Sequence, residues 1–113
     1  MNDLKERTKS FALRCMKLCA SLPKDRSADI LARQLIRSAT SVGANYRSAL
    51  RGRSKAEFIA KVGICLEEAD ESEFWLDLIS SADIMKTNLV EPVREEANAL
   101  TAIFVTTLKS SKK

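Results

Sequence analysis

The chain contains no histidine, and this absence argues against several kinds of site at once. Helical bundles that hold two metal ions use Glu-x-x-His pairs that point inward, and Ser-His or Cys-His nucleophiles need an imidazole. The phosphate-binding motifs G-x-x-x-x-G-K-[ST] and G-x-G-x-x-G are also missing. We therefore expect no metal site, no cofactor and no enzymatic activity of a familiar kind.

Glycine, proline and aromatic residues are scarce. The 113 residues include 3 Gly and 2 Pro, and aromatics make up 5%. Alternating patterns typical of strands are absent, whereas Ala, Leu, Glu, Lys and Arg are common and favour helices. This length suits one domain with one modest core. The apolar runs are too short to cross a bilayer, and the first residues lack a signal-peptide pattern, so we predict a cytoplasmic protein with no membrane partner.

The cysteines lack the features of a metal or redox site. Cys15, Cys19 and Cys65 are an odd number, and no C-x-x-C occurs. Cys15 and Cys65 fall on apolar helix faces, and Cys19 lies one turn after Cys15. We expect the three cysteines to be reduced and to act as small buried hydrophobic side chains, in a protein of a reducing compartment.

Apolar residues recur at three- and four-residue steps and predict four helices. Their expected ranges are about 3–21, 27–50, 54–81 and 91–109. Asp3 is a candidate cap for the first helix and Pro23 ends it. Ser54 and Glu57 match the capping box that starts the third helix, and Pro92 is expected in the first turn of the fourth. Because the links are short, the predicted fold is all-α: a single-domain, antiparallel up-down-up-down four-helix bundle over residues 1–113.

The second predicted helix carries arginines on one side. At 100° per residue, Arg33, Arg37, Arg47 and Arg51 lie within roughly 40° of one line, opposite the apolar face. This arginine line is about 27 Å long and is extended by Arg53 and Lys55. Guanidinium groups suit phosphate oxygens, so these six residues form a candidate nucleic-acid interface. The alternative is a solvated face, or one that pairs with acidic residues of a neighbouring subunit.

Charge is unevenly divided along the chain, although its sum is only +4. Residues 1–61 hold 14 Lys and Arg against 5 Asp and Glu, whereas residues 62–113 hold 5 against 10. Such a dipolar chain is suited to bind nucleic acid through its basic part, or to pair its own halves within or between subunits.

Several polar residues are assigned structural roles. The acidic run 67–73 is expected to be a solvated face, because a helix spreads consecutive side chains around its axis. Glu73 points toward the apolar side and needs a Lys or Arg from a neighbouring helix. Asn45 is either a satisfied structural amide or a hydrogen-bond partner across helices, with Glu71 as a candidate.

Two segments carry a family resemblance. Residues 34–45 and 53–58 resemble the bacterial four-helix-bundle proteins of the 23S rRNA intervening-sequence family, whose pattern is approximately Q-L-x-R-A-x-x-S-[IV]-x-x-N followed by R-S-x-x-E-F. Glu71, with Trp75 and Leu76 after it, fits the family's acidic position. The chain departs from the pattern at Ser38, where Ala is usual. It also departs at residues 48–50, where many relatives carry an Ala-Glu-Gly-like sequence, so the turn here is more basic.

The resemblance implies a non-enzymatic, oligomeric RNA- or DNA-binding accessory protein, with a homopentamer as the expected assembly. Some family members are encoded within segments that interrupt ribosomal RNA genes, and a related branch assists retroelement reverse transcriptases. Possible partners are therefore RNA or DNA, a reverse transcriptase or a ribosomal component. The alternative is a scaffold whose charges serve self-assembly or docking of a polymerase-type partner. The implied subunit contacts lie on two lines, Ile36, Gly43 and Leu50, and Ile64, Trp75 and Leu78.

Overall fold

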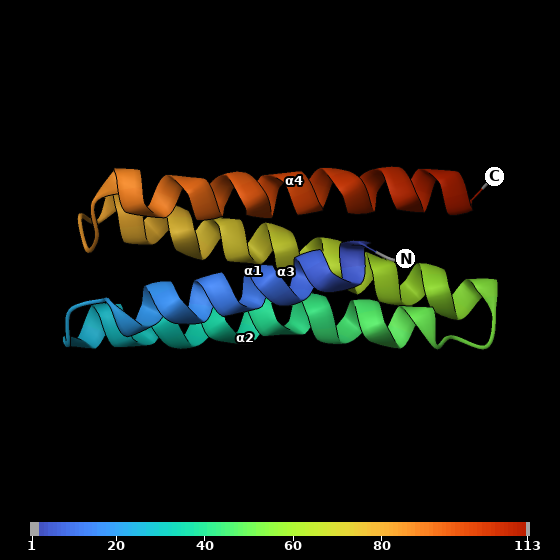
Figure 1. Ribbon diagram of the computed structural model, residues 1–113, viewed down its shortest axis with the longest axis horizontal. Helices are drawn as coiled ribbons and strands as arrows, with labels where there is room; N and C mark the ends of the chain where they lie inside the picture. The colour runs from blue at the N-terminus through green and yellow to red at the C-terminus, as the bar shows by residue number, and fades with distance from the viewer. Residues whose placement is uncertain (1–2, 113) are drawn as a thin grey trace.

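Four long helices make up the structure, a computed structural model that describes residues 3–112 (Figure 1). They are α1 (Asp3–Ala20), α2 (Arg26–Leu50), α3 (Lys55–Ser81) and α4 (Thr87–Ser111). Successive helices run in opposite directions, and the bundle measures 45 × 23 × 19 Å. Within the described part of the chain no residue is in a strand. The predicted all-α, up-down-up-down bundle is confirmed.

The starts of α2 and α3 follow from side-chain caps. Asp25 accepts a hydrogen bond from the Ala28 amide at 2.8 Å, and the Ser54 hydroxyl accepts one from the Glu57 amide at 3.1 Å. Glu57 in turn accepts from the Arg53 amide at 2.6 Å. These bonds satisfy amides that have no partner inside the helix, so each helix begins within one residue of its predicted start.

α4 begins at Thr87, four residues before the predicted start. No capping residue marks this start, because Lys86 occupies the cap position and its side chain makes no capping hydrogen bond. Pro92 therefore lies in the second turn, where its missing N–H leaves the Asn88 carbonyl without an intrahelical partner. Asn88 is exposed, so water can satisfy that carbonyl. The added turn buries Val90 completely, which stabilises it.

The core is one continuous cluster of apolar side chains from all four helices. Its largest fully buried members include Phe11, Leu35, Leu76 and Phe104. α2 packs along both α1 and α3, and α3 also packs along α4, whereas α1 and α4 touch less extensively. As predicted, Cys15 and Cys65 are fully buried, and Cys19 is half-buried. Among residues 3–112, every buried side-chain nitrogen or oxygen has a hydrogen-bond partner.

Candidate nucleic-acid interface

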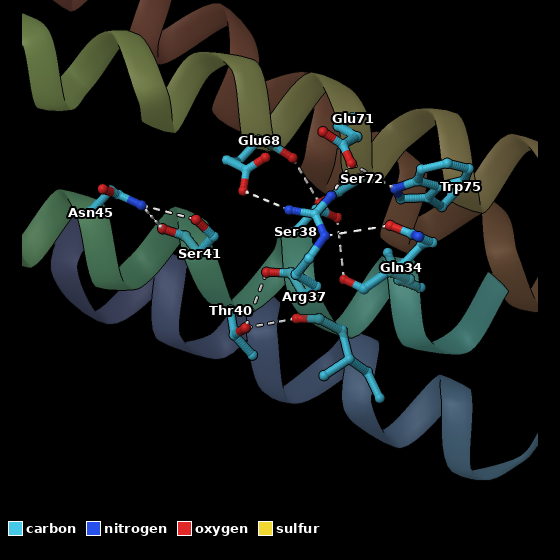
Figure 2. Close-up of polar contacts among 12 residues, drawn as sticks. Gln34, Arg37, Ser38, Thr40, Ser41, Asn45, Glu68, Glu71, Ser72 and Trp75 are labelled. Carbon is cyan, nitrogen blue, oxygen red and sulfur yellow. Dashed lines mark hydrogen bonds and ion pairs between the residues drawn. The ribbon is translucent and has the colours of Figure 1, made fainter. Parts of the chain in front are cut away.

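The N-terminal half of the arginine line, Arg33 and Arg37, is neutralised by carboxylates of the same chain. Arg37 reaches across to α3, where it pairs with Glu68 at 3.3 Å and also with Glu71 (Figure 2). Glu71 accepts a further hydrogen bond from the Trp75 indole at 3.3 Å. Beneath this network the Ser38 and Ser72 hydroxyls are buried and 2.8 Å apart. Arg37 therefore ties α2 to α3.

Arg33 is also paired, but on its own helix. It lies 2.9 Å from Asp29, one turn earlier, and its side chain is 79% exposed. An exposed i,i+4 pair of this kind is weak, about 0.3–0.5 kcal/mol. It nevertheless places a carboxylate beside the guanidinium. Arg33 and Arg37 thus differ from the arginines further along α2.

The C-terminal half of the line, Arg47 and Arg51, lines a pocket at the α2–α3 turn. This turn pocket has a volume of about 550 Å³, and its charged lining residues are Arg47, Arg51, Arg53, Lys61 and Glu57. Ala44, Ser48 and Gly52 complete the lining. In the described chain, no carboxylate lies within 4.0 Å of a charged nitrogen of these three arginines or of Lys61. Four cations thus face one open space together with a single carboxylate.

Two of the charged residues near the turn differ from expectation. Lys55 is exposed as the first residue of α3, but it does not line the pocket. Lys61 does, although the arginine line did not include it. The signal was available: in an antiparallel hairpin with a short turn, the first two turns of α3 lie opposite the last two turns of α2. Lys61 therefore faces the segment that carries Arg47 and Arg51.

The predicted structural polar residues find partners, with one correction. Asn45 donates to the Ser41 carbonyl and hydroxyl, each at 2.9 Å, so it is a satisfied amide within α2 (Figure 2). The suggested bond from Asn45 to Glu71 is wrong, because Glu71 lies against Arg37 and Trp75 instead.

Glu73 obtains the basic partner that its position required. Arg94 of α4 donates to it at 2.7 and 2.9 Å, and this hydrogen bonding raises the pKa of Arg94. Asp77 and Glu91 also lie near Arg94, at 3.7 and 3.5 Å. The prediction that a neighbouring helix supplies the counter-charge is confirmed.

The residues proposed for subunit contacts are spread over different environments. Leu50 is 43% and Ile64 38% exposed, whereas Ile36, Trp75 and Leu78 are half-buried. Gly43 faces α1, where a Cβ would lie 3.5 Å from the Thr8 hydroxyl. Gly43 is therefore placed against α1 within the same chain.

Phe74 was not among the predicted contact residues. It is 50% exposed, and its ring centroid lies 5.2 Å from that of Trp75, with the two rings tilted by 58°. At 100° per residue, Phe74, Leu78, Ile64 and Trp75 share an arc of about 100° on α3. We call this arc, which lies away from the fully buried residues of α3, the outward apolar side of α3.

Two other kinds of site have no support in the described residues. Over positions 3–112, no three His, Cys, Asp or Glu side chains are grouped so that they could hold a metal ion. None of the four described helices combines the length and the hydropathy needed to cross a membrane.

Comparison with known proteins identifies the family. The 23S rRNA-intervening sequence protein family matches residues 2–106. A crystal structure of a protein of unknown function from the S23 ribosomal protein family of Bacteroides thetaiotaomicron superposes with a TM-score of 0.87 at 30% identity. That alignment covers 93% of this chain and 97% of the other. No curated protein matches significantly. With its bundle, its sequence pattern and this match over nearly the whole length, the chain belongs to the 23S rRNA-intervening sequence protein family.

Proposed function

We propose that this protein is a non-enzymatic nucleic-acid-binding protein that holds phosphates at the α2–α3 turn. The binding residues are Arg47, Arg51, Arg53 and Lys61, hereafter the turn cluster. The observation that carries the proposal is their convergence on one pocket of about 550 Å³, with no carboxylate of the described chain within 4.0 Å of their charged nitrogens. Arg33 and Arg37 are left out, because carboxylates of α2 and α3 already neutralise them.

The chemistry of the pocket favours a phosphodiester. Arginine presents several N–H donors in a plane that matches phosphate oxygens, and lysine adds a compact charge. Glu57 is the one carboxylate in the lining, and its oxygen Oε2 accepts from the Arg53 amide. No aromatic side chain lines the pocket, so bases have no ring to stack on. Binding is therefore to the backbone and independent of sequence.

The family name indicates the first probe. The matching family is described by its relation to a 23S rRNA intervening sequence, and the Bacteroides thetaiotaomicron protein has unknown function. Neither description states that a member binds RNA. A structured RNA is the natural first ligand, with single-stranded DNA as comparison.

The test is a salt titration of RNA binding, measured by fluorescence anisotropy from about 50 to about 200 mM salt. Wild-type affinity should fall steeply with salt, because each neutralised phosphate releases a counterion. Arg51→Gln should lower the slope of log K against log salt by about 0.7 to 0.9. Arg33→Gln is the matched control, because it removes the same charge from a position of α2 outside the pocket and should leave the slope unchanged. An undetectable wild-type complex at low salt, or equal losses in both variants, would overturn the proposal.

We also propose self-association, on a separate observation. Phe74 is 50% and Ile64 38% exposed, and they lie with Leu78 and Trp75 on the outward side of α3. Exposed apolar side chains that share one side of a helix favour contact with another protein surface. A second copy of the chain is the proposed partner, in line with the expected homo-oligomer. In the competing scaffold hypothesis, this side of α3 would dock a polymerase-type protein instead.

A further inference from the structure

A second basic pocket adjoins the turn pocket. It lies between α1 and α2 and has a volume of about 470 Å³. Its charged lining residues are Lys5, Glu6, Lys9 and Arg47. No carboxylate of the described residues pairs with Lys5 or Lys9 within 4.0 Å. We call it the α1–α2 pocket. Like the turn pocket, it carries a clear excess of positive charge.

The two pockets share part of their lining. Ala44 and Arg47 belong to both, so one turn of α2 separates a basic pocket on its α1 side from a basic pocket on its α3 side. We call this turn of α2, which carries Ala44 and Arg47, the ridge between the pockets. Arg47 lies on it and is exposed. A ligand that fills both pockets must pass over this turn of α2, and Arg47 is placed to contact it on the way.

The ridge is low at the crossing point. Ala44 is exposed and ends at its methyl group, and Gly43 beside it has no side chain. A Cβ on Gly43 would lie 3.7 Å from the Thr8 backbone carbonyl carbon, so this position of α2 faces α1 across an ordinary contact distance. The short side chain of Ala44 keeps the outer surface of α2 open between the pockets.

We propose that a nucleic-acid strand crosses α2 over Ala44, with phosphates in both pockets and Arg47 between them. This path rests on the proposed function, which it extends from a single pocket to a track. The six cations along it are Lys5, Lys9, Arg47, Arg51, Arg53 and Lys61, against the two carboxylates Glu6 and Glu57. The track runs across α2, whereas the arginine line read from the sequence runs along it.

A strand fits these observations better than an isolated anion. A single phosphate or a mononucleotide can occupy one pocket but cannot engage the cations of both. The α1–α2 pocket, like the turn pocket, has no aromatic side chain in its lining. The contacts are therefore to the backbone, and affinity should rise with strand length until both pockets are filled.

The test replaces the two α1 lysines together, as Lys5→Gln with Lys9→Gln. The matched control is Lys24→Gln with Lys86→Gln. These exposed lysines lie in the α1–α2 and α3–α4 connections, which are at the opposite end of the bundle from the α2–α3 turn (Figure 1). With single-stranded RNA longer than about 16 nucleotides, the Lys5/Lys9 variant should lower the salt slope by about 1.4, at about 0.7 per phosphate contact. The control should not change it. With a mononucleotide, both variants should bind like the wild type.

A neutral substitution tests the crossing itself. Ala44→Leu raises the ridge without changing any charge, and leucine is well tolerated in a helix. It should weaken binding of the long RNA several-fold while mononucleotide binding at the turn pocket persists. Circular dichroism confirms that each variant remains helical.

The outcomes separate this inference from the proposed function. If wild-type protein binds RNA and Arg51→Gln weakens it, but the Lys5/Lys9 variant matches its control, the track is wrong and the turn pocket stands. If the wild type does not bind RNA at low salt, both are wrong. If Ala44→Leu binds long RNA as tightly as the wild type, the strand does not pass over the ridge.

Discussion

Burial controls the chemistry of the cysteines. Cys15 and Cys65 are fully enclosed in the core, and desolvation raises the pKa of each thiol from 9.0 to about 12. Cys19 is half-buried, and the same effect raises its pKa to about 11. Thiolate is the reactive form, so all three side chains are inert near neutral pH in the folded protein.

These thiols predict a loss of stability at alkaline pH. Above about pH 9 the unfolded chain releases the thiol protons while the folded chain retains them. The unfolded state then binds fewer protons, so the free energy of unfolding falls as pH rises from about 9 toward 12. Each thiol contributes up to about 1.4 kcal/mol per pH unit in that window. Urea unfolding under reducing conditions at about pH 8 and about pH 10.5 measures the change.

The double variant Cys15→Ala with Cys65→Ala is the control for this effect. It removes both titrating groups, so its stability should depend less on pH over the same interval, even though the smaller side chains lower its stability overall. Equal pH dependence in the two proteins would show that the thiols are not protected by burial.

The arginines show where reasoning from single residues ends. Helix geometry correctly places Arg37 and Arg47 on the side of α2 away from its core face, and both are exposed. It does not reveal that Glu68 and Glu71 of α3 reach Arg37, while Arg47 meets no described carboxylate. That difference depends on the packing of one helix against another, which a single helix's periodicity does not contain.

At the scale of helices, Arg94 links α3 to α4. Its side chain is 25% exposed, and it faces Glu73 together with Asp77 and Glu91. Replacing it by Arg94→Met would leave three carboxylates near one another and Glu73 half-buried without its donor. We expect a loss of about 1–3 kcal/mol in the free energy of unfolding, measured by urea denaturation.

Arg33→Met is the matched control for this link, because Arg33 makes only an exposed pair within α2. It should cost no more than about 0.5 kcal/mol. If both variants lose the same stability, the Arg94 cluster contributes nothing beyond a surface ion pair. The double change of Arg94→Met with Glu73→Leu should recover part of the loss, since it removes the unpaired carboxylate.

Helix boundaries were predictable where a side chain caps the helix. The starts of α2 and α3 were both predicted to within one residue. The Ser54 cap of α3 was recognised in the sequence, whereas the Asp25 cap of α2 became visible only in the structure. α4 was misjudged because Lys86 offers no such bond, and Pro92 was taken as a first-turn residue. The burial of Val90 decides this boundary, and burial depends on the tertiary fold.

At the scale of the whole molecule, the division of charge along the chain becomes a division in space. The basic half of the sequence forms α1, α2 and the first turns of α3, which lie together in the bundle (Figure 1). Some acidic residues of the second half pair with basic residues of the first half. Glu96 pairs with Arg7 at 2.8 Å, and Glu68 of α3 pairs with Arg37 at 3.3 Å. Six further cations of the basic half line the two pockets beside the α2–α3 turn.

Assembly also depends on the whole molecule, because it joins the surfaces of complete chains. Trp75 was one of the predicted subunit contacts, but it is half-buried and its indole donates a hydrogen bond to Glu71, so Trp75→Ala would also disturb the fold. Phe74 separates the two effects, because half of it is exposed. We expect Phe74→Ser to lower the molecular mass measured by light scattering while the melting temperature changes little, since the lost contact lies between copies of the chain.

Leu89→Ser is the control for assembly, because Leu89 is 55% exposed on α4, away from the apolar side of α3. If association depends on the outward side of α3, this equally severe loss of exposed apolar surface should leave the mass unchanged. A wild type that is monomeric at high concentration would refute the contact altogether. Equal dissociation of both variants would mean that association follows general surface hydrophobicity and not a defined face. If Phe74→Ser keeps its mass while Leu89→Ser dissociates, the interface lies on α4 instead.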